Sequence, residues 1–154
     1  MKNKNFFKSF VHAANGIRLA CRDERNMRCH ITAGALITVF AYFYGLSKTE
    51  WAILLIAIFS VIASELVNTA VERAVDTATN EFRETAKIAK DAAAGAVLMT
   101  AIGAVLIGIC LFGDIYRITY TLLSIFKSPV NLAICSAVLL LCIVFLIITR
   151  RKGK

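Results

Sequence analysis

Hydrophobic and polar positions follow one another in long blocks along the chain, and the apolar blocks have the length of membrane spans. Three blocks, at 51–71, 92–112 and 129–149, cover 21 residues each. At about 1.5 Å per residue in a helix, each is long enough to cross a hydrocarbon layer of about 30 Å. A shorter block at 31–46 is joined to the next only by 47–50 ("SKTE"), which predicts a tight antiparallel hairpin.

The segments between these blocks have patterns of their own. Residues 5–22 place phenylalanine and aliphatic side chains at helical spacing with basic residues between them. This pattern predicts an amphipathic helix on the membrane surface, although a plain basic anchor stays open as the alternative. Residues 113–128 fit either an external loop or a half-buried interfacial segment.

Composition agrees with a membrane protein. Of the 154 residues, 58% are hydrophobic and the mean hydropathy is +0.70, whereas soluble domains are about 45–50% apolar. The five cysteines show no metal-ligand spacing and are expected to be reduced. The fold class expected is therefore an all-α membrane protein, with an N-terminal amphipathic surface helix and four transmembrane helices.

Positive charge sets the predicted orientation. Fifteen of the 18 Lys and Arg residues fall in 1–30, 72–91 and 150–154, and three fall in the segments on the other side. The positive-inside rule then places the N-terminus in the cytoplasm of a multi-pass protein of the cell membrane. The net charge of +8 needs no nucleic-acid partner, because anionic lipid accounts for it.

A polar stripe crosses the second span at 64–76 ("SELVNTAVERAVD"). At about 100° per residue, Glu65, Asn68, Glu72 and Asp76 share one narrow face of the helix. A charged residue near the middle of a span costs at least about 2.5–3.5 kcal/mol, so its presence indicates a function. Glu65 is expected at the depth of a lipid headgroup linkage and Glu72 near water, which suits an enzyme joining a water-soluble donor to a lipid acceptor.

Two further clusters lie on the predicted cytoplasmic side. Residues 22–30 ("RDERNMRCH") contain Glu24, and residues 86–97 ("AKIAKDAAAGAV") contain Lys90 and Asp91. Two carboxylates, Glu24 and Glu72, can hold Mg²⁺ when phosphates complete the shell, and Lys90 can neutralise those phosphates.

Each of these features also has a purely structural interpretation. Glu65 can be a hydrogen-bonding residue between helices, Glu72 and Asp76 a solvated helix face, and the other clusters surface charges. Their joint position at one membrane interface favours a site.

The stretches "ELVNTAVERAVD", "AKIAKDAAAGAV" and "ERNMRCH" together resemble the bacterial diacylglycerol kinase family, specifically its undecaprenol kinase branch. The resemblance covers about residues 5–112. It implies a kinase domain at 1–112 with a three-helix transmembrane core, and leaves 113–154 as a loop and an additional C-terminal transmembrane helix. It also implies a homotrimer.

The resemblance implies specific roles as well. Glu65 would be the catalytic base at the lipid substrate, with Asn68 beside it; Arg28 would lie in a lipid-contacting segment. Glu24 and Glu72 would be the Mg²⁺ ligands within an ATP site. That site would also include Asp76, Glu81, Phe82, Lys90 and Asp91.

The reaction expected is transfer of the ATP γ-phosphoryl group to a lipid hydroxyl, with undecaprenol as the first candidate and diacylglycerol as the alternative. A small transporter or channel using the Glu65 stripe and a non-catalytic membrane scaffold are the rivals from other classes. Against a channel, residues 52–63 offer only Ser60 as a polar continuation of the stripe.

Overall fold

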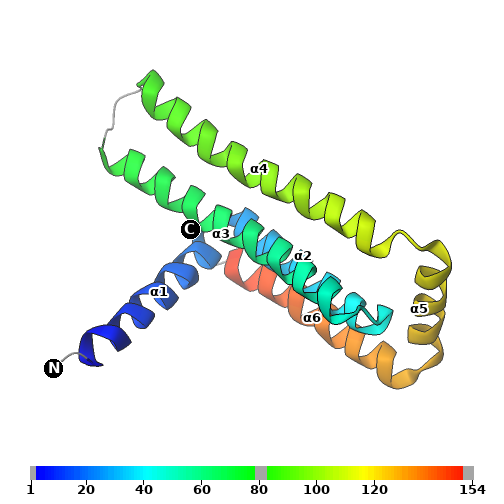
Figure 1. Ribbon diagram of the computed structural model, residues 1–154. Helices are drawn as coiled ribbons and strands as arrows, with labels where there is room; N and C mark the ends of the chain where they lie inside the picture. Colours follow the sequence, from blue (N-terminus) through cyan, green and yellow to red (C-terminus); the bar gives the residue numbers. More distant parts are fainter. Residues whose placement is uncertain (1–2, 79–82, 151–154) are drawn as a thin grey trace.

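The expected all-α architecture is confirmed. The computed structural model describes residues 3–78 and 83–150, and these form six helices and no strand. The helices are α1 (Asn3–Asp23), α2 (Arg25–Tyr44), α3 (Lys48–Ala78), α4 (Glu84–Phe112), α5 (Ile115–Lys127) and α6 (Pro129–Arg150) (Figure 1).

Within the described residues, three helices are long and apolar enough to cross a membrane: α3, α4 and the Pro129–Ile147 part of α6. The first two pack along each other as a long antiparallel pair, and α2 lies between α3 and α6 (Figure 1). Because the first six of the 20 residues of α2 are mostly polar, α2 is less apolar than the other three. That α2 crosses the membrane as a fourth span stays a prediction.

The predicted hairpin between α2 and α3 is confirmed, and its turn is closed by local hydrogen bonds. Gly45 takes the left-handed conformation (φ 75°) that favours glycine, and its N–H donates to the Ala41 carbonyl at 3.1 Å. Ser47 and Glu50 form a reciprocal cap at the start of α3: the Ser47 N–H donates to the Glu50 carboxylate at 2.7 Å, and the Glu50 N–H donates to the Ser47 hydroxyl at 3.3 Å.

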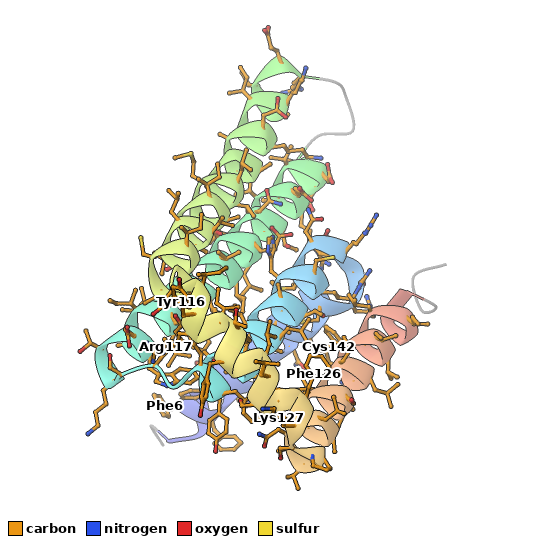
Figure 2. All side chains as sticks on the ribbon, turned by 90° about the vertical axis from the view of Figure 1, so that its right-hand side faces the viewer. Phe6, Tyr116, Arg117, Phe126, Lys127 and Cys142 are labelled. Carbon is orange, nitrogen blue, oxygen red and sulfur yellow. The ribbon has the colours of Figure 1, made fainter. Side chains whose placement is uncertain are left out.

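The sequence of residues 113–128 fitted either an external loop or a half-buried interfacial segment. In the structure this segment contains a helix, α5, which lies across one end of the bundle (Figure 2). Asp114 caps it by accepting from the N–H groups of Tyr116 and Arg117. Thr121 and Ile125 are buried against the bundle, whereas Tyr116 is 86% exposed. The helix therefore has one face on the protein and an aromatic face outward, as expected of an interfacial segment.

Arg117 joins α5 to the end of α2. Its Nε donates to the Tyr44 carbonyl at 3.1 Å and its Nη2 to the Gly45 carbonyl at 2.6 Å, while the guanidinium lies 4.2 Å from the centre of the Tyr44 ring. A cation at a helix C-terminus satisfies carbonyl groups that have no partner within the helix and opposes the negative end of the helix dipole.

We expect Arg117→Gln to destabilise the protein by about 2 kcal/mol, because two charge-assisted hydrogen bonds and a cation–π contact are lost. For a chain of this size, that corresponds to a fall of roughly 4–8 °C in the apparent Tm. Thermal denaturation in detergent measures it. Lys127→Gln removes the same charge from an exposed position on the same helix and should leave Tm nearly unchanged; equal losses in both variants would contradict the role of Arg117.

The expected amphipathic helix at the N-terminus is present as α1, which leaves the bundle at a steep angle (Figure 1). Phe6, Phe7 and Phe10 are 61–73% exposed, so the apolar side of α1 is not covered by the protein itself. Such a face is suited to the headgroup region of a bilayer.

Candidate active site

The polar stripe of α3 changes steadily from buried to exposed along the helix. Glu65 is 2% and Asn68 8% exposed, Glu72 is half-buried and Asp76 is exposed. The amide Nδ2 of Asn68 donates to Oε1 of Glu72 at 3.0 Å. The stripe therefore links a fully buried carboxyl group to side chains that solvent can reach.

Two acceptor atoms at the buried end of the stripe lack a partner within the described part of the chain. These are Oε2 of Glu65 and Oδ1 of Asn68. Buried polar atoms are nearly always hydrogen-bonded in folded proteins, so two neighbouring exceptions point to groups supplied from outside the chain. A carboxylate oxygen in this position can accept a hydrogen bond, and then a proton, from a hydroxyl group.

Three ionisable side chains lie near the carboxyl group of Glu65. Glu24, His30 and Glu72 are all close enough to its carboxyl group to interact electrostatically with it. Glu24 stands at the N-cap position of α2, but its side chain makes no capping hydrogen bond and is free for another partner. The predicted metal ligands Glu24 and Glu72 therefore lie in the surroundings of the same buried carboxyl group.

The acidic side chains of the described residues do not form a complete metal site by themselves. No group of three or more His, Cys, Asp or Glu side chains that could hold a metal occurs in residues 3–78 and 83–150. Mg²⁺ is commonly bound through only one or two carboxylates, with water and phosphate oxygens completing its octahedral shell. Glu24 and Glu72 are two carboxylates near the same buried carboxyl group, and that they hold Mg²⁺ stays a prediction.

Ion pairs connect the helices at the exposed end of the stripe. Lys90 of α4 pairs with Asp76 of α3, and Arg73 of α3 binds Asp23 of α1 at 2.7 Å. Hydrogen bonds from Arg22 and then from Arg73 hold the pKa of the Asp23 carboxyl below its usual value. The structure thus brings together Lys90 and Asp76, two of the residues expected at the nucleotide.

Of the remaining residues expected at the nucleotide, the structure describes only Asp91. Asp91 is exposed and has no ion-pair partner among the described residues. Glu81 and Phe82 lie outside the described residues.

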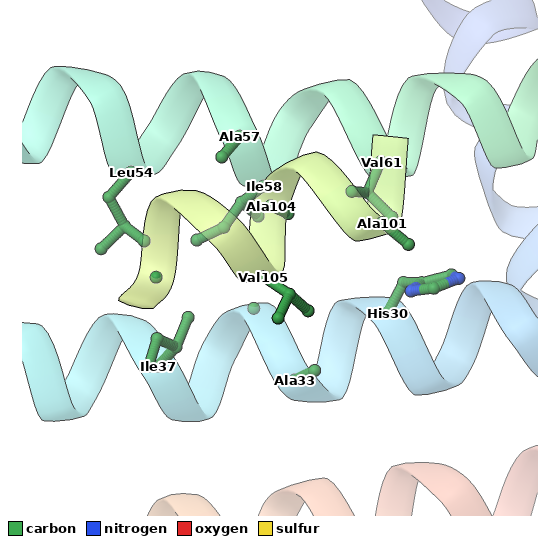
Figure 3. A pocket seen from close by; sticks show the side chains of 12 residues that line it. His30, Ala33, Ile37, Leu54, Ala57, Ile58, Val61, Ala101, Ala104 and Val105 are labelled. Atoms are coloured by element: carbon green, nitrogen blue, oxygen red, sulfur yellow. The ribbon is translucent and has the colours of Figure 1, made fainter. Parts of the chain in front are cut away.

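An apolar pocket of about 390 Å³ lies between α2, α3 and α4 (Figure 3). It is lined by His30, Ala33, Gly34, Ile37, Leu54, Ala57, Ile58, Val61, Ala101, Ala104, Val105 and Gly108. Val61 is one helical turn before Glu65 on the same face of α3, so the pocket leads toward the buried carboxyl group. At the same level, Ser64 and Thr100 share a hydrogen bond of 2.8 Å that joins α3 to α4.

His30 was not assigned a role from the sequence, yet it connects the pocket to the carboxylates. It lines the pocket and interacts electrostatically with Glu65. A signal was present: His30 shares a face of α2 with Ala33, Gly34 and Ile37 at helical spacing, so a polar side chain precedes three small or apolar ones on that face.

Arg28 does not line the apolar pocket. It is 7% exposed, and its Nη1 donates to the carbonyl groups of Cys21 at 3.2 Å and Arg22 at 2.9 Å, at the C-terminal end of α1. The role expected of Arg28 at the lipid substrate stays a prediction.

The chain thus combines helices that are long and apolar enough to cross a membrane with a buried carboxyl group beside an apolar pocket, as expected of a membrane enzyme that acts on a lipid. More specifically, the chain belongs to the prokaryotic diacylglycerol kinase family, whose model matches residues 11–112. It is accordingly a kinase, a phosphotransferase with an alcohol group as acceptor.

Curated relatives support this assignment. The chain is 43% identical over 107 residues to an undecaprenol kinase of Bacillus subtilis, covering 70% of this chain and 87% of the relative. It is 42% identical over 108 residues to a diacylglycerol kinase of Synechocystis, covering 70% of this chain but 62% of that relative. A diacylglycerol kinase of Helicobacter pylori is 32% identical over 96 residues, covering 62% of this chain and 75% of that relative. No solved structure matches the chain.

Proposed function

We propose that the protein transfers the γ-phosphoryl group of ATP to the hydroxyl group of undecaprenol and so makes undecaprenyl phosphate. The observation that carries this proposal is Glu65, which is 2% exposed and has a carboxylate oxygen without a partner in the described chain. It stands between an apolar pocket and a polar, solvent-reaching stripe. A lipid alcohol and a nucleotide can approach it from these two sides.

In this mechanism Glu65 accepts the proton of the acceptor hydroxyl as the oxygen attacks the γ-phosphorus atom, and the bond from that phosphorus to the bridging oxygen breaks to release ADP. The free Oδ1 of Asn68 accepts a hydrogen bond from the acceptor or from a water molecule beside it. Catalysis of phosphoryl transfer consists mainly of positioning and of neutralising charge.

The binding site for ATP, the phosphoryl donor, is assigned to charged residues at the N-cap of α2 and on α3 and α4. Glu24 and Glu72 would hold Mg²⁺, which when bound supplies neutralisation of charge on the β- and γ-phosphates. Lys90, released from Asp76, neutralises a further phosphate oxygen. Asp91, Glu81 and Phe82 complete the nucleotide site in the proposal, on the strength of the family resemblance.

The acceptor is assigned by similarity. The relative with 43% identity is named an undecaprenol kinase and the one with 42% identity a diacylglycerol kinase. The "ERNMRCH" and "AAGAV" motifs favour undecaprenol, and diacylglycerol is the second candidate. Both acceptors have one free hydroxyl group and long hydrocarbon chains, so the apolar lining of the pocket suits either.

A cytoplasmic active site and a homotrimer are parts of the same proposal. The α1–α2 junction, the end of α3, the start of α4 and the end of α6 lie at one end of the bundle, opposite to α5 (Figure 1). The described parts of the segments rich in Lys and Arg are at that end, and in the proposal the positive-inside rule assigns it to the cytoplasm.

A transporter or channel is supported less well. Beyond Glu65 the space between the helices is lined by apolar side chains, with His30 at its near end as the single polar one. A proton or ion entering along the stripe would have no polar path onward.

The test is transfer of radiolabelled phosphate from γ-labelled ATP by the purified protein in mixed micelles. Undecaprenol and diacylglycerol are offered separately and together. We expect label in both, with kcat/KM at least about tenfold higher for undecaprenol, equivalent to about 1.4 kcal/mol of transition-state binding. The reverse preference would replace the acceptor, and no label in either lipid from folded protein would refute the proposed reaction.

A further inference from the structure

A second cavity lies between the first turns of α2 and the C-terminal turns of α6. It has a volume of about 400 Å³ and is lined by Arg25, Arg28 and Cys29 on one side and by Leu146 and Ile147 on the other. One wall is contributed by α6, which lies beyond the residues 11–112 matched by the family model. None of the residues of the polar stripe on α3 lines this cavity.

The α2 wall is positively charged. Neither arginine forms an ion pair within residues 3–78 and 83–150. Hydrogen bonds to the end of α1 hold the guanidinium of Arg28 through Nη1 alone, so its position is fixed while its remaining donors make no hydrogen bond in that part of the chain. A fixed guanidinium beside a second one matches the fork geometry in which arginines bind phosphate oxygens.

The α6 wall is apolar and its depth is defined. Leu146 and Ile147 lie near the end of the apolar run 129–149, which the basic residues of 150–154 follow in the sequence. The cavity therefore lies at the boundary between hydrocarbon and headgroups. From there, the surface of α6 leads into the hydrocarbon layer.

We propose that this cavity binds an anionic phospholipid of the surrounding bilayer, with its phosphate on Arg25 and Arg28 and its chains along Leu146 and Ile147 of α6. Basic pockets between transmembrane helices at the membrane surface are suited to anionic headgroups. The kinase acceptor is a different ligand, because it is an uncharged alcohol and gains nothing from two arginines. The added helix thereby gives this chain a lipid site that is separate from the catalytic carboxylates.

Native mass spectrometry of the full-length protein, without ATP, tests the proposal. The protein is released from phosphatidylcholine bilayers that contain phosphatidylglycerol, and bound lipid is counted. We expect phosphatidylglycerol to be retained, with an apparent Kd about tenfold higher in Arg25→Gln, a change of about 1.4 kcal/mol that follows from the loss of one charge-assisted contact. Leu146→Trp, which fills the cavity without changing charge, should weaken retention by a similar factor.

Arg18→Gln is the matched control, since Arg18 is exposed on α1 and does not line the cavity. Its Kd should stay within about twofold of the wild-type value. Equal weakening in Arg18→Gln and Arg25→Gln would show a general charge effect and overturn the proposal. When undecaprenyl phosphate and phosphatidic acid are added to the bilayers, retention of either one with no phosphatidylglycerol would also overturn it, because that result identifies a site for a phosphorylated product. Both outcomes are independent of kinase activity.

Discussion

Replacing Glu65 with glutamine is expected to lower kcat by at least about 100-fold and up to about 10,000-fold, the range that a positioned general base contributes. Glutamine has nearly the same shape as glutamate, so the packing of this buried side chain is kept while its ability to take a proton is lost. The KM for ATP should change little, because Glu24, Glu72 and Lys90 are expected to hold the nucleotide. Labelled phosphate transfer at saturating lipid and ATP measures the effect.

Two further variants separate catalysis from structure in this experiment. Glu65→Asp keeps the carboxylate on a shorter side chain and should restore activity well above that of Glu65→Gln. Glu84→Gln removes a carboxylate from an exposed position in the first turn of α4 and should behave as wild type. If Glu65→Gln kept half of the activity or more while remaining folded, Glu65 would not be the base.

The polar stripe was predictable from the sequence because it depends on a single helix. The spacing of Glu65, Asn68, Glu72 and Asp76 fixes their common face whatever the helix packs against. The hydropathy of the preceding residues sets their order of depth. The structure adds the exposure gradient and the hydrogen bond between Asn68 and Glu72.

Contacts between residues far apart in the sequence were not predictable. The two donors of Arg117 reach carbonyl groups more than 70 residues earlier in the chain, so the packing of α5 against the end of α2 could not be inferred from residues 113–128 alone. The pairing of Lys90 with Asp76 likewise depends on how α4 returns along α3. A local pattern contains no information on such distant partners.

Residues of the cluster at 22–30 line two different cavities. The chain turns at Glu24, and α2 begins at Arg25. At about 100° per residue, Arg25, Arg28 and Cys29 share one face of α2, while His30 lies on a different face. The first face lines the cavity at α6 and the second meets the pocket near Glu65, a division that the sequence cluster alone did not reveal.

Replacing Glu72 with glutamine is the variant expected to have the second largest effect. Loss of one of two carboxylates proposed for Mg²⁺ should lower kcat/KM for Mg–ATP by about 100-fold, corresponding to about 3 kcal/mol of charge stabilisation. The Mg²⁺ concentration needed for half-maximal activity should rise at least about tenfold. The KM for the lipid should stay near the wild-type value, because Glu72 lies on the solvent-reaching part of the stripe and does not line the apolar pocket.

The Mg²⁺ dependence is what separates a metal ligand from a structural residue at this position. Glutamine at position 72 can still accept the hydrogen bond that Asn68 donates to Oε1, so a purely structural role predicts nearly normal activity with unchanged Mg²⁺ dependence. A metal-binding role predicts a shifted metal titration and partial recovery at high Mg²⁺ concentration. Glu84→Gln provides the charge control here too, since it removes an exposed carboxylate from α4. A large loss of activity in Glu72→Gln with an unshifted Mg²⁺ titration would assign Glu72 to positioning Asn68 and leave Glu24 as the one proposed carboxylate ligand.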